Sequence, residues 1–180
     1  LHLMDISDAA VVGHSMGSLV AIELAARLPE TVKSTVLLST AMPMPVSDDL
    51  LNAAKANDHE AIDMITVWGH GRSSQLGGHK IPGLWMIGSA GRLLEQAAKS
   101  VLYADLNACH TYQDGLRTAS CIRCPVLLMV GKDDRMTPPQ ASRALADVIP
   151  DCTIEIIEGC GHMMMIEKPD QVLDYMRDAF

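Results

Sequence analysis

The sequence predicts an α/β fold in which a parallel sheet is flanked by helices. Two observations lead to this prediction. Uninterrupted apolar runs, such as residues 9–12 and 126–130, are typical of parallel strands that are buried on both faces. Segments with helical character separate these runs, and the connections between them are short, which is the pattern of βαβ units.

The first βαβ unit occupies the beginning of the chain. Residues 1–7 are interpreted as the end of a helix or a loop that enters the apolar strand at residues 9–12. Helix-forming residues follow from Ser18 to Leu28, and Pro29 ends them. A second apolar strand lies within residues 32–39, so this region predicts two parallel strands with a right-handed crossover.

The segment from about residue 47 to residue 120 differs because it shows no pattern of a buried strand. Ser47 and the two aspartates after it favour the start of a helix, and apolar residues at helical spacing recur from Leu50 to Leu102. A glycine-rich stretch, residues 69–83, interrupts these helices and is interpreted as a point of flexibility. We therefore expect a helical insertion between two strands of the sheet.

Strand and helix alternate again after residue 120. Residues 125–131 predict another apolar strand, and residues 137–140 (Thr-Pro-Pro-Gln) predict a helix that Thr137 caps and that runs to about Val148. Residues 153–157 alternate between apolar and polar side chains, which places a fourth strand nearer an edge of the sheet. Pro169 begins a closing amphipathic helix.

Size, charge and cysteine content limit the classes of function. A chain of 180 residues with 48% hydrophobic residues and a mean hydropathy of +0.15 suits one globular domain. A net charge of −8 without a basic cluster argues against nucleic acid or a membrane as partner. Five scattered cysteines favour a cytoplasmic location over a disulfide framework. The oligomeric state stays open.

The sequence Gly13-His14-Ser15-Met16-Gly17 follows the pattern G-x-S-x-G at the turn between the first strand and its helix. A serine at so sharp a turn has a strained backbone, so we expect small residues two positions away, here Gly13 and Gly17. The helix N-terminus would place the Met16 amide beside negative charge on the Ser15 oxygen. The alternative interpretation is an ordinary turn between strand and helix.

A serine nucleophile requires a base, and the base requires a carboxylate that fixes its tautomer. Loops at the carboxyl ends of parallel strands share one edge of the sheet. Three such loops contain Ser15, the adjacent acids Asp133 and Asp134, and His162, so we expect these side chains to converge. We expect His14 to be a packing or hydrogen-bonding neighbour, because the base must approach the serine from another loop.

With these motifs the chain resembles the α/β-hydrolase family. The resemblance is carried by residues 13–17, by residues 131–138 with the family's G-x-x-D-x-x-x-P pattern, and by residues 159–162 with its G-x-G-H pattern. It implies Ser15 as the nucleophile and Asp134, rather than Asp133, as the acid. It also implies His162 as the base and the Met16 amide as an oxyanion donor.

The resemblance also implies a division of the chain. A three-layer core would comprise residues 1–42 and 120–180, and residues 43–119 would form a helical cap. The family's second oxyanion donor comes from a loop after an early strand, often marked by His-Gly, and this sequence has no such segment. We therefore expect that the N-terminal part of the sheet is missing, and that the isolated chain folds poorly and hydrolyses esters weakly.

The activity that the resemblance implies is that of a serine hydrolase. It would cleave a carboxylic ester or a related small-molecule acyl substrate through an acyl-enzyme intermediate, with neither a metal nor an organic cofactor. The same triad would also suit C–C bond hydrolysis or cofactor-free perhydrolysis. Some relatives use this fold as a binding or interaction module, which is the alternative outside catalysis.

Other conspicuous residues favour structural roles. Cys121 and Cys124 form C-x-x-C, but Cys124 leads into a strand, which argues against a redox-active pair. Of the three methionines at residues 163–165, we expect at least two in core packing. The histidines of the helical insertion lack metal-like spacing and are expected to be solvated or to cap helices: His59, His70, His79 and His110.

Overall fold

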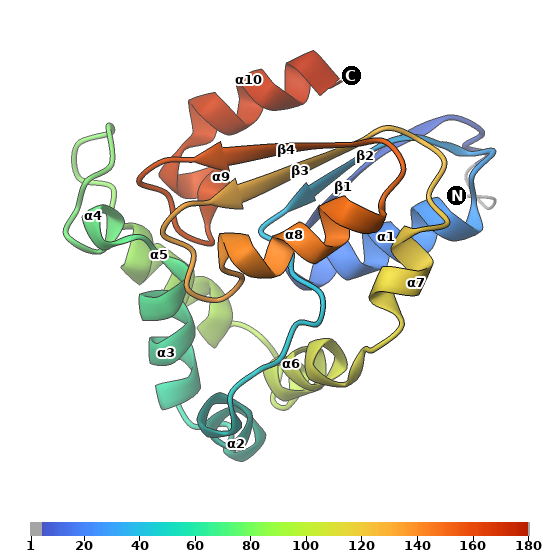
Figure 1. The fold of residues 1–180 in the computed structure, drawn as a ribbon. Helices are drawn as coiled ribbons and strands as arrows, with labels where there is room; N and C mark the ends of the chain where they lie inside the picture. Colours follow the sequence, from blue (N-terminus) through green and yellow to red (C-terminus); the bar gives the residue numbers. More distant parts are fainter. Residues whose placement is uncertain (1–4, 180) are drawn as a thin grey trace.

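The computed structural model describes residues 5–179, and these contain a four-stranded parallel sheet (Figure 1). The register aligns Leu37 of the second strand with Gly13 of the first and Leu128 of the third. Because all strands run the same way, the loops after them meet at one edge of the sheet. In chain order and in space the strands are β1 (Ala9–His14), β2 (Val32–Leu38), β3 (Val126–Gly131) and β4 (Cys152–Ile157).

Helices cover both faces of the sheet, which gives the predicted three layers (Figure 1). Successive side chains of a strand point to opposite faces. Accordingly, Leu128 and Val130 pack into one core, and Leu127 and Met129 pack into the other. The first core is covered by α1 (Met16–Arg27), α7 (Gly115–Ala119) and α8 (Pro139–Val148), the second by α9 (Met164–Glu167) and α10 (Pro169–Ala179).

The outer strands of the described sheet are partly exposed. Ile154 and Ile156 of β4 face solvent, which confirms the predicted edge position of this strand. Burial of the first strand on both faces was also expected, but Val12 is 43% exposed. The reason is topological, because within residues 5–179 β1 pairs with β2 alone.

The segment between β2 and β3 is helical, as predicted, and has its own small core around Leu50, Ala54, Ala61 and Ile65. The Ser47 hydroxyl accepts a hydrogen bond from the Leu50 amide at 3.4 Å and so caps the first of these helices. Figure 1 shows the helices gathered beneath the sheet layer. They are α2 (Asp48–Ala56), α3 (Glu60–Gly69), α4 (Arg72–Gln75), α5 (Met86–Glu95) and α6 (Val101–Thr111), with α7 returning to α1.

The first helix begins at Met16, directly after Ser15, so its N-terminus lies where the turn motif predicted it. One detail of the prediction was wrong. Thr137 does not cap α8, which begins at Pro139 without a side-chain cap, because the threonine hydroxyl donates to Asp134 instead. No helix in the described part of the chain is long and apolar enough to cross a membrane.

Candidate active site

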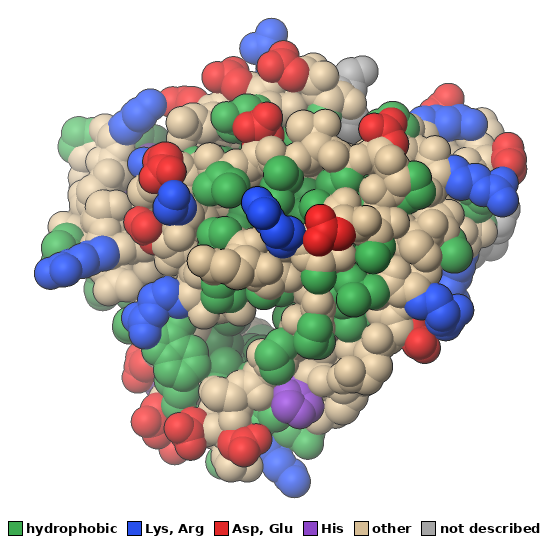
Figure 2. All heavy atoms as spheres, viewed as in Figure 1, with side chains coloured by type: hydrophobic (Ala, Val, Ile, Leu, Met, Phe, Trp, Pro, Cys, Tyr) green, Lys and Arg blue, Asp and Glu red, His purple; other side chains and the backbone are tan. Residues whose placement is uncertain are grey.

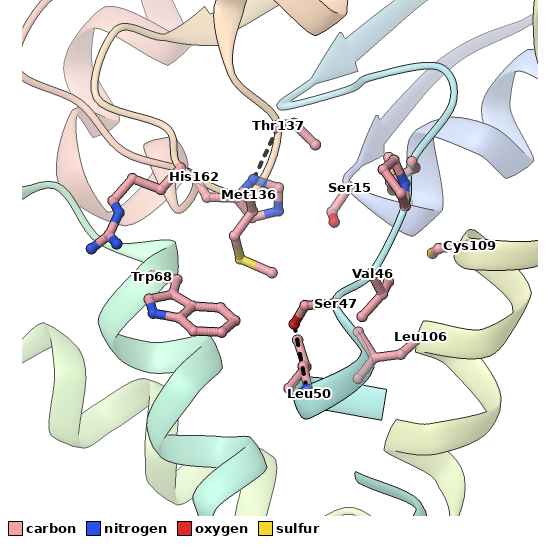
Figure 3. Close-up of a pocket in the computed structure, with 13 residues that line it drawn as sticks. Ser15, Val46, Ser47, Leu50, Trp68, Leu106, Cys109, Met136, Thr137 and His162 are labelled. Atoms are coloured by element: carbon pink, nitrogen blue, oxygen red, sulfur yellow. Dashed lines mark hydrogen bonds between the residues drawn. The ribbon is translucent and has the colours of Figure 1, made fainter. Parts of the chain in front are cut away.

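Ser15 occupies the single residue between β1 and α1. Its backbone has φ 52° and ψ −121°, a strained conformation that non-glycine residues rarely adopt. The Ser15 amide donates to the Leu38 carbonyl at 3.0 Å, and the Ser15 carbonyl accepts from the Ser18 amide at 2.9 Å and from the Ser18 hydroxyl. These bonds hold the serine at the tip of the turn, where its side chain faces a cavity (Figure 3).

The two glycines of the motif have different surroundings. A Cβ on Gly13 would lie 2.3 Å from the Gly17 carbonyl oxygen and 2.6 Å from the Ser18 Cα, so the strand and helix approach too closely for any side chain. A Cβ on Gly17 would meet no described atom within 4 Å. The expected close approach is therefore confirmed at Gly13, and the expectation of crowding at Gly17 was wrong.

Asp134 lies in the loop after β3 and accepts four hydrogen bonds. Oδ1 accepts from the Met136 and Thr137 amides, each at 2.8 Å. Oδ2 accepts from the Thr137 hydroxyl at 2.7 Å and from His162 Nδ1 at 2.9 Å. Burial tends to raise the pKa of the Asp134 carboxyl, but the hydrogen bond and charge of His162 and the bonds from Thr137 hold this pKa below its usual range. Asp133 is exposed, whereas the buried Asp134 forms the hydrogen bond with His162.

His162 is buried and held by its backbone as well as by its ring. The His162 carbonyl accepts from the Ser39 hydroxyl and from His14 Nε2, each at 2.9 Å. The two imidazole rings lie 4.9 Å apart between centroids. Burial, together with the neighbouring His162, lowers the pKa of His14 to about 4, so His14 is neutral near pH 7. The predicted role of His14 as a hydrogen-bonding neighbour is confirmed.

Glu167 connects the His162 loop to the helical segment. Its Oε1 accepts from the Gly161 amide at 3.1 Å, and its Oε2 accepts from the Gly71 amide at 2.9 Å and the Ser74 hydroxyl at 2.7 Å. The two loops are in close contact here, because a Cβ on Gly161 would lie 2.4 Å from the Gly71 nitrogen. One buried carboxylate therefore joins the residue before His162 to the start of α4.

Ser15 and His162 line the same cavity, of about 220 Å³ (Figure 3). Most of its wall is apolar, and Val46, Leu50 and Trp68 contribute to it from the helical side. Figure 2 shows a hollow with hydrophobic side chains at its margin, between the sheet layer and the helices. This volume is below the roughly 300–1,000 Å³ typical of sites for drug-sized ligands, so the cavity suits a small molecule.

Sequence reasoning missed three residues that support this site: Thr137, Ser39 and Glu167. Thr137 bonds to Asp134 and lies 3.2 Å from His162 Nδ1, but the sequence pattern indicated a helix cap. Ser39 directly follows β2, so its place at the shared sheet edge was a signal that could have found it. Nothing in the sequence alone distinguished Glu167 from a surface glutamate.

The other conspicuous residues have mixed outcomes. Met164 lies in the second core and Met165 packs against it, which confirms the packing prediction for the methionines. His59 is exposed as predicted. His70 is buried rather than solvated, but it ends α3 and its Nδ1 donates to the Thr66 carbonyl at 2.7 Å, which agrees with the expected capping role. All five cysteines are free. Within residues 5–179 no three His, Cys, Asp or Glu side chains group as metal ligands.

Similar proteins place this geometry in a wider context. A protein named as a carbamate hydrolase, RutD, from Pseudomonas syringae pv. syringae is 28% identical over 94% of this chain and 66% of its own length. One named as a non-heme bromoperoxidase, BpoC, from Mycobacterium tuberculosis is 26% identical over the whole chain and 71% of its own length. A solved structure of a thermophilic esterase has a TM-score of 0.80 at 26% identity, over 97% of this chain and 66% of that one.

The chain thus spans about two thirds of the length of these relatives. The model of the alpha/beta hydrolase family matches residues 2–175, which include all three loops at the sheet edge. This match covers nearly the entire sequence and agrees with the parallel sheet, the turn at Ser15 and the order of the loops. The chain belongs to the alpha/beta hydrolase family.

Proposed function

We propose that this chain supplies the nucleophile, base and acid of a serine hydrolase that cleaves a carboxylic ester or a related acyl compound. The observation that carries the proposal is the meeting of three loops at one cavity: Ser15 after β1, Asp134 after β3 and His162 after β4. The similarity to an esterase and to a protein named as a carbamate hydrolase supports a carbonyl substrate.

The proton relay follows from the hydrogen bonds of His162. An ionised carboxylate accepts hydrogen bonds and donates none, so the Asp134 contact fixes the proton on His162 Nδ1. Nε2 is then the atom that accepts the Ser15 hydroxyl proton as Oγ attacks the carbonyl carbon. The imidazolium returns this proton to the leaving group as the carbonyl carbon–heteroatom bond breaks. Water attacks the acyl-enzyme by the same route and releases the acid and Ser15.

Two features favour the charged intermediates of this reaction. Met16 is the first residue of α1, so its amide lacks a partner within the helix and can donate to an oxyanion on the carbon that Ser15 attacks. His14 is neutral near pH 7, so it does not repel the positive charge that develops on His162. Asp134, held ionised, stabilises that charge directly.

The remaining parts of the proposal concern domains and location. Residues 43–119 act as a cap that covers the nucleophile, and residues 1–42 and 120–180 act as the core. Support comes from the separate core of the helical segment and from its contribution to the cavity wall. A cytoplasmic location is supported by the five cysteines, all of which are free thiols.

Labelling with a fluorophosphonate tests the proposal. Ser15 Oγ would form a bond to phosphorus, fluoride would leave, and the proton would pass to His162. In the protein that carries this chain, we expect one label per chain on the peptide containing Ser15. Ser15→Ala should abolish labelling, and Ser120→Ala, at an exposed serine, should not change it. Labelling that is unaffected by Ser15→Ala would refute the proposal.

A second candidate, perhydrolysis by the same triad, is favoured by the similarity to BpoC over the whole chain. Hydrogen peroxide would replace water in attacking the acyl-enzyme and would release a peracid, which oxidises bromide. Bromination of monochlorodimedone in acetate, peroxide and bromide should then depend on Ser15. If Ser15→Ala abolishes ester hydrolysis but leaves bromination unchanged, this second candidate is excluded.

A further inference from the structure

Strand β4 forms an open edge of the sheet. Within residues 5–179 it pairs with β3 alone, and this pairing runs without a bulge from Cys152 to Ile157. Proteins commonly protect such an edge with lysine, proline or a bulge, because its free backbone groups pair readily with other chains. β4 has none of these devices, and its one charged side chain is Glu155. The edge is therefore suited to pairing with a further strand.

Two isoleucines make one face of this edge apolar. Ile154 is 36% exposed and Ile156 is 42% exposed. Together with Pro139 and Arg143 they line a hollow of about 600 Å³ between β4 and the start of α8. Helix α8 thus leaves this part of the strand uncovered. A strand added beside β4 would remove both isoleucines from water, which is favourable.

The hydrogen bonds to β3 determine which backbone groups of β4 are free. The Val126 amide donates to the Asp151 carbonyl, and the Lys132 amide donates to the Ile157 carbonyl, each at 2.9 Å. Because backbone groups alternate in direction along a strand, the odd-numbered residues between these two positions also face β3. The residues whose amides and carbonyls face outward are Cys152, Ile154 and Ile156.

This pattern of outward groups is complementary to itself. In two antiparallel copies related by a two-fold axis at Ile154, the outward groups of Ile154 would face each other, and those of Cys152 would face those of Ile156. Glu155 would then lie opposite Thr153. An axis at Glu155 would instead place two carboxylates opposite each other, which is unfavourable. The charge of Glu155 therefore favours the register centred on Ile154.

The ends of this pairing also bring opposite charges together. The register centred on Ile154 places Asp151 of the second copy opposite Ile157. Arg143 and Lys132 line the hollow at this end of β4. Lys132 already pairs with Glu158 at 3.2 Å, so Arg143 is the cation that we assign to Asp151 of the second copy. By symmetry this attraction occurs twice.

We propose that two copies of this chain associate through β4, in antiparallel register about Ile154, and so join their sheets into one. The other open edge of the described sheet is less suited, because β1 contains Ala10 and Gly13 and its pairing with β2 is irregular near its start. The inference is independent of the proposed function, since Ile154 and Ile156 lie outside the cavity of Ser15.

Sedimentation of the protein that carries this chain tests the association, in about 0.15 M salt to screen the charge of −8 on each copy. We expect a dimer with a Kd on the order of 10 µM, because one strand pair is smaller than a standard interface of roughly 1,600 Å². Ile154→Lys should raise this Kd at least about tenfold, since the axis brings the two lysines together. Leu173→Lys, at a side chain 57% exposed on α10, is the matched control and should not change it.

A cysteine on the axis tests the register and does not depend on the folding of the lysine variant. Facing Cα atoms of a hydrogen-bonded antiparallel pair lie about 5.5 Å apart, which suits a disulfide. With Cys121→Ser and Cys152→Ser removing the accessible native thiols, Ile154→Cys should give a disulfide-linked dimer in oxidised glutathione, and Leu173→Cys should not.

Three results would overturn the inference. The first is a protein that stays monomeric well above the expected Kd, which would also be the result if β4 paired only with a strand of a different protein. The second is a dimer that Ile154→Lys leaves intact, which would place the contact elsewhere, for example at β1. The third is equal cross-linking through Ile154→Cys and Leu173→Cys, which would show random collision rather than a defined register.

Discussion

Asp134 shows how single side chains define the candidate site. All four of its hydrogen bonds come from the loop that follows it and from His162, so its carboxylate orients both the loop and the imidazole. Burial alone would disfavour the ionised form, and these donors offset that cost. The geometry of His162 therefore depends on the donors around Asp134, and Thr137 is the one that contacts both residues.

Thr137→Val tests this dependence. It removes the hydroxyl that donates to Asp134 Oδ2 at 2.7 Å and keeps the shape of the side chain. A hydrogen bond to a charged group contributes about 1.5–3 kcal/mol, so we expect kcat/KM for p-nitrophenyl esters to fall by roughly tenfold or more. Thr137→Ser should restore most of the activity, because the hydroxyl returns. Equal losses in both variants would contradict this account, because the hydroxyl is absent from the valine variant and present in the serine variant.

The lowered pKa of His14 predicts that the stability of the fold depends on pH. Its pKa falls from 6.5 to about 4 on folding, so between these values the unfolded chain binds a proton that the folded chain does not. The free energy of unfolding should therefore be highest above pH 6.5 and decrease as the pH falls toward 4, by up to about 3 kcal/mol from this residue. Urea unfolding at pH 7 and pH 4.5 measures this loss.

His14→Gln should reduce that loss, because glutamine keeps a donor for the His162 carbonyl but does not titrate. His59→Gln is the control, since folding raises the pKa of this exposed histidine through Glu95 and Asp63 and so cannot cause an acid-side loss. A pH dependence that is the same in the wild type and in His14→Gln would contradict the account of this residue.

At the scale of elements, the turn between β1 and α1 depends on backbone contact at one glycine. Gly13→Ala should lower the free energy of unfolding by about 1–3 kcal/mol or more, because its Cβ would collide with the backbone of Gly17 and Ser18. Gly17→Ala meets open space within a helix and should be neutral or stabilising. Chemical denaturation compares the two, and similar destabilisation of both would contradict this description of the turn.

The connection between α4 and the His162 loop is a second feature at this scale. Glu167→Ala leaves the Gly71 and Gly161 amides and the Ser74 hydroxyl without their acceptor, so we expect a loss of about 2–4 kcal/mol in unfolding free energy. Glu158→Ala, at an exposed surface pair with Lys132, should cost less than about 1 kcal/mol. If the two variants unfold alike, Glu167 does not link these elements.

For the whole molecule, the sequence was most informative where a local pattern determines the structure. Apolar runs predicted three strands, alternation of apolar and polar residues predicted the fourth, and the turn motif placed Ser15, because hydrophobic periodicity and backbone strain depend on neighbouring residues. Contacts between segments that lie far apart in the sequence could not be predicted from local patterns. The burial of His70 and the acceptor role of Glu167 arise only when the helical segment packs against the His162 loop, 90 residues or more along the chain.

The central claim is that Ser15, His162 and Asp134 act as one proton relay at the carboxyl edge of the sheet. The most direct test is a crystal structure of the protein after reaction with diethyl p-nitrophenyl phosphate. We predict a phosphorus atom bonded to Ser15 Oγ, His162 Nε2 within hydrogen-bond distance of the adduct, and the His162 Nδ1–Asp134 bond of 2.9 Å retained. An adduct on another residue, or a His162 ring turned away from Ser15, would contradict the claim.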